Sequence, residues 1–269
     1  MSNKKELGIY ILSCLIITNI LWYVGYGIHE KNEESIIELL VILLASFMPA
    51  IIAVIMCKLK KEKLRTLLLF PNIKKSLKVY LIAILTSLLI VYSSDLLPLL
   101  FFPGNVLIVS ENLTFIFFGQ IILFTMACII ESIGLLGEEL GWMGYLFPGL
   151  EKEYGTFPAI FIISIIRTLW HLVALIKIDG SLFAVCNLFI SNLFLQSLLV
   201  YVTKKSNSVF PAAIVHSITN IMVVLSFVSY TEEFYNNNFI RFNLIELIPI
   251  IIVGTIFFIL LYKEQNKNE

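Results

Sequence analysis

Charged residues are scarce in this chain of 269 residues. Only 14% of the residues are Asp, Glu, Lys or Arg, whereas 59% are hydrophobic, a mix far from that of a soluble globular domain. The formal net charge of zero argues against nucleic acid or any strongly acidic partner. Because a membrane helix needs about 20 apolar residues, the length suits six to eight spans and leaves no room for a sizeable soluble domain.

Signatures of several common chemistries are also missing. The cysteines all fall in apolar runs without a Cys-x-x-Cys pair, so neither a disulfide framework nor a thiolate metal site is expected (Cys14, Cys57, Cys128 and Cys186). The chain has no Gly-x-Ser-x-Gly, no P-loop and no His-Glu-x-x-His, so the usual serine, P-loop and zincin routes are not indicated. It also lacks a visible inverted repeat, which weighs against a small transporter.

Long apolar runs are what the chain has in abundance. They cover residues 8–28, 36–57, 79–101, 114–140, 157–177, 181–202, 210–230 and 244–262. We therefore predict an all-α polytopic membrane protein with about eight transmembrane helices in one bundle. Within this single membrane domain, residues 1–113 supply the N-terminal spans and a basic loop, 114–230 the core with the candidate site, and 231–269 the last span and tail. The first run is too long for a signal-peptide core, so we expect it to be retained.

The distribution of Lys and Arg predicts the orientation. With a cytoplasmic N-terminus, fifteen of the nineteen fall in inside segments, Lys31, Lys177 and Arg241 lie outside, and Arg167 lies within a span. This asymmetry predicts that both termini are cytoplasmic. The stretch 58–78 holds eight of these cations and is interpreted as a topology anchor. The alternative is a short amphipathic helix that lies on the membrane and is attracted to anionic lipid.

Ionisable residues inside the predicted spans are costly, so each one needs a partner or a function. Glu38, Asp95 and Glu246 fall near the outer ends of their runs, where slightly shifted boundaries would put them in water. The others and their uncharged companions all lie between residues 131 and 220 (Glu131, Glu138, Glu139, Arg167, His171, Asn187, Asn192, Gln196, His216 and Asn220). Glu138 and Glu139 fall at the expected cytoplasmic end of the fourth span, where they can also be read as a solvated helix end. Trp142 and Tyr145 just after them are interpreted as marking the membrane interface.

Two further spans add polar pairs spaced four residues apart, which place both members on one helix face. These pairs are Arg167 with His171, and His216 with Asn220. Each alone is more often a packing or interhelical hydrogen-bonding pair. Together with the carboxylates they are groups from which a hydrolytic site can be assembled, with a carboxylate as general base, His to orient water, and His or Asn to bind the oxyanion.

The order Glu-Glu-x-Gly-Trp-x-Gly-Tyr-Leu-x-Pro, then Trp-His, then His-x-x-x-Asn resembles the CAAX protease and bacteriocin-processing family of intramembrane endopeptidases, over about residues 130–225. The resemblance implies a conical bundle of about eight helices with a water-filled cavity open to the cytoplasm. In it, Glu138 and His171 activate water, and His216 and Asn220 form the oxyanion hole. Glu139 supports the site, and we count three further residues as supporting, which are Trp142, Arg167 and Trp170.

The resemblance favours a glutamate-type mechanism that needs no cofactor, and no metal ligand is assigned. The alternative is a Zn²⁺ site, because Glu138, His171 and His216 could also hold zinc with one open position. The expected partners are the lipid bilayer and a peptide or lipidated-protein substrate. The sequence predicts no oligomeric state.

Two positions depart from the family pattern. Met143 stands where the first motif usually has Arg, and Arg167 stands where the second motif usually has an aromatic residue. Our hypothesis is that Arg167 supplies the missing cation from another helix and pairs with Glu139 or Glu138. The alternative is a divergent member without catalysis, such as a bacteriocin self-immunity or interaction protein.

The expected spans also raise a geometric problem. Glu138 lies near the inner end of its span, whereas His171 is about 14 residues into the next, on the order of 20 Å along a helix. The two can lie level only if the fourth helix runs deeper than its apolar run, or if the linker after it is partly embedded.

Overall fold

The structure is a computed structural model, and it describes residues 4–29, 35–103, 107–108, 131–178, 180–221, 228–229 and 231–268. The first half contains α1 (Lys4–His29), α2 (Ile36–Leu59), the short 3₁₀ turn η1 (Leu64–Leu67) and α3 (Ile73–Phe101). Residues 131–141 are helical and lead into the π-helical turn η2 (Trp142–Leu146) and α5 (Phe147–Tyr154). The second half contains α6 (Thr156–Trp170), α7 (Leu172–Ile178), α8 (Leu182–Ser206), α9 (Phe210–Ile221) and α10 (Glu232–Asn268). Two short strands, β1 (Leu107–Ile108) and β2 (Val228–Ser229), pair antiparallel.

Apolar helices of membrane-spanning length dominate the described part of the chain. α1, α2, α3, α8 and α10 are each long and apolar enough to cross a bilayer, and α6 is a shorter apolar helix of 15 residues. The prediction of an all-α polytopic protein is thereby confirmed. The expected run 114–140 lies largely outside the described residues, as does the end of the run 210–230. The number eight therefore stays a prediction.

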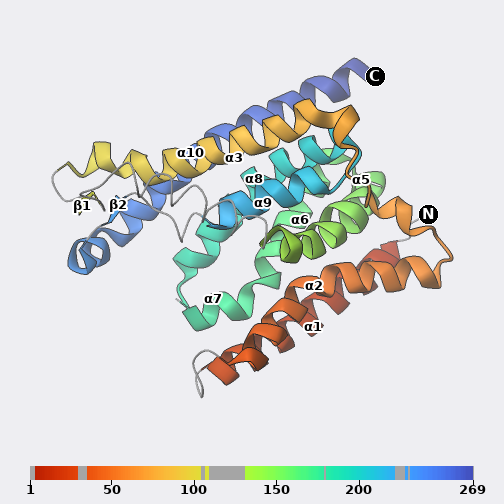
Figure 1. Cartoon of the computed structure of the whole chain (residues 1–269), viewed down its shortest axis with the longest axis horizontal. Coiled ribbons are helices and arrows are strands. Elements are labelled where there is room, and N and C mark those ends of the chain that lie inside the picture. The colour runs from red at the N-terminus through yellow and green to blue at the C-terminus, as the bar shows by residue number, and fades with distance from the viewer. Residues whose placement is uncertain are drawn as a thin grey trace.

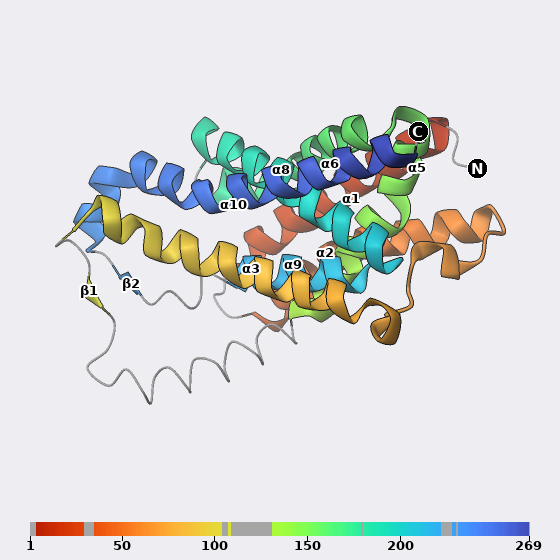
Figure 2. The same cartoon turned by 90° about the horizontal axis from the view of Figure 1, so that it is seen from above.

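The helices form one elongated bundle (Figure 1). α1 packs with α2 along one side and α3 packs with α10 along the other, while α6, α8 and α9 lie between these pairs. The start of α1 and the end of α10 lie at the same end of the bundle in both views (Figures 1 and 2). This arrangement agrees with an even number of spans, and the side of the membrane stays a prediction.

The fourth helix is longer than expected. Instead of ending near residue 140, it continues through η2 and α5 to Tyr154, where Gly155 with a φ of 85° turns the chain into α6. Glu139 therefore lies about four turns before the helix end, which removes the geometric problem of the expected hairpin. Trp142 and Tyr145 are both buried in the bundle, and their interfacial depth stays a prediction.

The fifth apolar run is not one helix, as predicted, but two. α6 ends at Trp170 and α7 begins at Leu172, with His171 at the break. Asn19 of α1 bonds the backbone on both sides of this break. Its Nδ2 donates to the carbonyl of Leu169 at 3.3 Å, and its Oδ1 accepts from the amide of Val173 at 3.1 Å. Because backbone groups in a membrane need partners within the protein, Asn19 stabilises the interruption.

Glycines bring the fourth helix close to α2 and η1. A Cβ on Gly141 would lie 2.4 Å from Cβ of Pro49 in α2 and 2.5 Å from the hydroxyl of Tyr10 in α1. A Cβ on Gly144 would lie 2.6 Å from the carbonyl oxygen of Leu67 in η1. Small residues permit this close packing of membrane helices, and here they fix the carboxylate-bearing helix against the N-terminal pair.

Candidate active site

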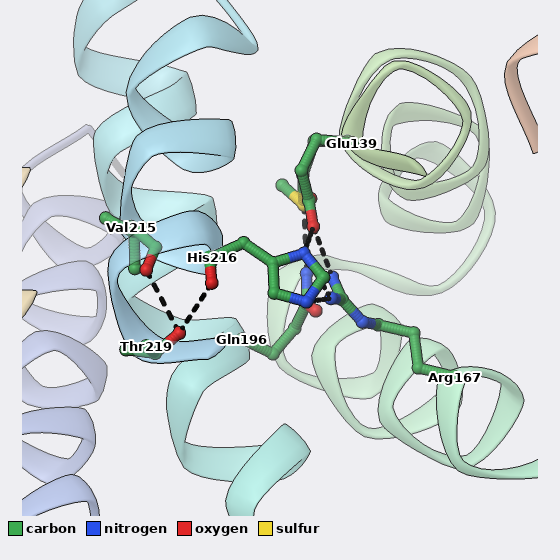
Figure 3. Close-up of polar contacts among 7 residues, drawn as sticks. Glu139, Arg167, Gln196, Val215, His216 and Thr219 are labelled. Carbon is green, nitrogen blue, oxygen red and sulfur yellow. Dashed lines mark hydrogen bonds and ion pairs between the residues drawn. The ribbon is translucent and has the colours of Figure 1, made fainter. Parts of the chain in front are cut away.

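A buried cluster of three ionisable side chains joins three helices (Figure 3). Glu139 comes from the helix of residues 131–141, Arg167 from α6 and His216 from α9. Oε1 of Glu139 accepts a hydrogen bond from Nη1 of Arg167 at 2.9 Å and lies 2.8 Å from Nδ1 of His216. Nη2 of Arg167 lies 3.1 Å from Nδ1 and 3.3 Å from Nε2 of the same imidazole. Three distant parts of the sequence therefore meet around one carboxylate oxygen.

Each member of the cluster is almost completely shielded. The exposed fractions are 0% for Glu139, 2% for Arg167 and 5% for His216. A lone charge at such a place would cost several kcal/mol, and removal of one partner from a buried pair typically costs about 3–5 kcal/mol. The carboxylate and the guanidinium therefore depend on each other.

The two departures from the family pattern lie beside this cluster. Arg167 pairs with Glu139, one of the two partners expected for it. Met143, at the position where the family usually has Arg, is fully buried, and its Sδ accepts a hydrogen bond from Nε2 of Gln196 in α8 at 2.9 Å. The guanidinium of the cluster thus comes from α6. At the position where the family usually has Arg, the thioether of Met143 contacts the amide of Gln196 instead.

Glu138 is buried but is not part of the ion-pair cluster. Its exposed fraction is 4%, and its Oε2 has no hydrogen-bond partner among the described residues. Trp142 follows one turn later on the helix, and its indole N–H interacts with the Glu138 carboxyl, although the two do not reach the geometry of a full hydrogen bond. Buried polar atoms of this kind are normally satisfied by protein or by ordered water. The unpartnered carboxylate oxygen is therefore available to a water molecule or a substrate.

His171 lies at the break between α6 and α7 and contacts the same aromatic cluster. Its ring meets Trp170 edge-on at a centroid distance of 4.5 Å, and Trp170 meets Trp142 edge-on at 6.0 Å. No hydrogen bond or ion pair between described residues joins His171 to Glu138. The structure thus connects the two expected water-activating groups through a pair of indoles and not through a direct bond.

Asn220 lies apart from the ion-pair cluster. It is exposed, on the turn of α9 after His216, and its side chain hydrogen bonds with Glu131. His216 and Asn220, the pair expected to bind the oxyanion, therefore lie on one helix. His216 contacts Glu139, whereas Asn220 contacts Glu131.

Asn19 is a site neighbour that the sequence reasoning missed. It bonds the backbone around His171, yet it belongs to the first apolar run, far from the motifs. A polar amide in an otherwise apolar span was the available signal.

A metal centre is not assembled among the described residues. No three side chains of His, Cys, Asp or Glu in those ranges lie close enough to hold an ion. Glu138, His171 and His216, the ligands considered for zinc, are accordingly not gathered around one point.

Comparison with known proteins points to the family that the motifs resemble. The family model for type II CAAX prenyl endopeptidases, Rce1-like, matches residues 117–222, a stretch that contains all three motifs. A curated relative, CAAX prenyl protease 2 of the archaeon Methanococcus maripaludis, is 29% identical over 178 residues. The aligned part covers 63% of this chain and 63% of the relative, slightly less than two thirds of its length. Motifs, family model and relative agree in what this chain is similar to, the type II CAAX prenyl endopeptidases.

Proposed function

We propose that this protein is an intramembrane endopeptidase that hydrolyses a peptide bond of a peptide or lipidated protein at a cytoplasm-facing cavity of the plasma membrane. The observation that carries the proposal is the buried cluster of Glu139, Arg167 and His216, which three helices of the family-matched stretch bring together. Because buried charges in a membrane are costly, such clusters generally mark a functional site.

Glu138 is the proposed general base. It accepts a proton from water that His171 helps to orient, the hydroxide attacks the scissile carbonyl, and Glu138 passes the proton to the leaving amine. His216 and Asn220 donate to the oxyanion of the tetrahedral intermediate. Glu139 and Arg167 hold the His216 ring in place. The unpartnered, buried oxygen of Glu138 supports its role as base.

The test is cleavage of a lipidated or bacteriocin-precursor peptide by the purified protein in lipid. Glu138→Ala and His171→Ala are each expected to lower the rate by about 10²–10⁴ while the protein stays folded and in the membrane. The matched controls are Glu38→Ala and His29→Ala. His29 at the end of α1 and Glu38 at the start of α2 form a Glu–His pair outside the candidate site, so both variants should cleave like the wild type. Full activity in both site variants would disprove the proposed mechanism.

The same assay with a chelator addresses the cofactor. Cleavage that persists after extended chelation supports the glutamate-type mechanism, which needs no metal. Loss of activity that zinc alone restores supports a zinc enzyme.

Met143 favours one alternative, a non-catalytic bacteriocin self-immunity or interaction protein, because the motif arginine is absent from its usual position. Exposure of cells to the bacteriocin separates the two functions. Protection that survives Glu138→Ala and His171→Ala would indicate binding, whereas its loss in folded variants would indicate catalysis.

A further inference from the structure

We propose that residues 58–78, here named the basic segment, form a binding surface for the headgroups of anionic phospholipids. The segment joins α2 to α3 and includes η1. It lies at the end of the bundle where α1 begins and α10 ends (Figures 1 and 2). The proposal does not depend on proteolytic activity, because it concerns a different surface of the molecule.

The charge of the segment is unusual for this chain. It holds eight of the nineteen Lys and Arg residues and a single acid, Glu62, although the whole chain has no net charge. Lys60 is paired, since its Nζ lies 3.1 Å from Glu6 and 3.0 Å from Glu62. The other cations form no ion pair with any residue that the structure describes, and all are exposed (Lys58, Lys61, Lys63, Arg65, Lys74, Lys75 and Lys78). These exposed cations are complementary in charge to a polyanionic surface.

Apolar side chains stand among these cations. Phe70 and Ile73 are 60% and 53% exposed, and Leu64 and Leu77 are exposed as well. In water this exposure would be unfavourable, but at a membrane surface the apolar groups enter the headgroup boundary while Lys and Arg meet the phosphates. The mixture favours lipid over a soluble acidic protein as the partner.

The segment is also held firmly on the protein. Leu67 is buried beneath Gly144 of η2, and the carbonyl of Leu68 accepts a hydrogen bond from the amide of Val209 at 3.2 Å. Nδ2 of Asn72 donates to the carbonyls of Ser206 and Asn207, at 3.3 Å and 3.2 Å. The cations are therefore presented on a fixed frame, so less ordering is required when headgroups bind.

These anchors touch elements that carry the candidate site. η2 continues the helix of Glu138 and Glu139, and Val209 immediately precedes α9, the helix of His216. Headgroup binding should consequently stabilise the packing around the site as well as the segment itself.

The experiment compares thermal unfolding of the purified, detergent-solubilised protein after addition of phosphatidylglycerol or phosphatidylcholine. We expect phosphatidylglycerol to raise Tm by roughly 3–5 °C more than phosphatidylcholine does, because a ligand that binds only the folded state stabilises it. The triple variant Lys74→Gln, Lys75→Gln, Lys78→Gln should stay folded and lose most of this difference. High salt should reduce the difference in the wild type.

The matched control removes three exposed cations at the same end of the molecule, by Lys152→Gln, Lys263→Gln and Lys267→Gln, and should keep the response. Soluble glycerol phosphate should give none, because it lacks the acyl chains. Equal responses to the two lipids, or equal loss in both triple variants, would overturn the proposal. A response to polyglutamate but not to phosphatidylglycerol would also overturn it and would indicate an acidic protein partner.

Discussion

Arg167 contributes from α6 a cation that the family pattern places on the fourth helix. In the structure its guanidinium donates a hydrogen bond to Glu139 and also contacts the ring of His216. Replacement by Met removes the guanidinium and leaves a buried carboxylate without its counter-ion. We expect Arg167→Met to destabilise the protein by about 3–5 kcal/mol or to abolish activity, measured by thermal unfolding in detergent and by peptide cleavage.

Restoration of the family pattern is the complementary experiment. In Met143→Arg combined with Arg167→Phe, the new guanidinium would start from the position whose sulfur now contacts Gln196. Oε1 of Gln196 has no partner in the described part of the chain and can accept a hydrogen bond from it. The double variant should therefore recover much of the stability and activity that Arg167→Met loses. The exposed Arg241→Met is the control, and a silent Arg167→Met would refute the exchange.

The residue types of the candidate site could be predicted from the sequence, but their partners could not. Polar residues in apolar runs identified Glu138, Glu139, His171 and His216 as costly and therefore noteworthy. Their contacts depend on the rotation of each helix about its axis, which neighbouring helices determine. That Glu139 and not Glu138 bonds the cation is a consequence of this packing.

Asn19 connects α1 to the break between α6 and α7. If His171 acts in catalysis, its position depends on this interruption, and Asn19 bonds the backbone on both sides of it. We expect Asn19→Ala to cost about 1–2 kcal/mol of stability, since two backbone groups lose their partner. Because Asn19 acts by positioning His171, the Asn19→Ala change should lower kcat more than it raises KM. Thr18→Ala, at a neighbouring hydroxyl with no partner in the described ranges, is the control, and equal effects of the two changes would contradict the role.

The hydropathy of the sequence does not predict where two of the helices end. An apolar run ends where polar residues begin, but the fourth helix continues past its run because η2 and the first turn of α5 are buried largely against other helices. Hydropathy cannot distinguish these two surroundings. The break at His171 was equally invisible, because it is stabilised by Asn19 from a distant part of the chain and not by a local Pro or Gly.

Gly141 sets the distance between the fourth helix and the N-terminal helix pair. A methyl group there would meet the backbone of Pro49 at 2.5 Å, and a backbone cannot move aside as a flexible side chain can. Gly141→Ala should therefore separate the helices and cost about 1–3 kcal/mol, with lower activity because Glu138 and Glu139 move with their helix. The measurement is thermal unfolding beside the cleavage assay. Gly8→Ala, where no atom lies within 4 Å, should be neutral or slightly stabilising, and equal Tm values for both variants would contradict the packing argument.

The basic residues predict the orientation of the whole molecule in the membrane. The basic segment, the start of α1 and the end of α10 share one end of the bundle, while the end of α3 and the start of α10 lie at the other (Figure 1). Because Lys and Arg are retained on the cytoplasmic side, the first end should face the cytoplasm. In a bacterial host, a fluorescent protein fused after residue 269 should fluoresce and alkaline phosphatase fused there should be inactive, whereas phosphatase fused after Pro103 should be active. The opposite pattern would place the basic segment on the outer face and would contradict the predicted orientation.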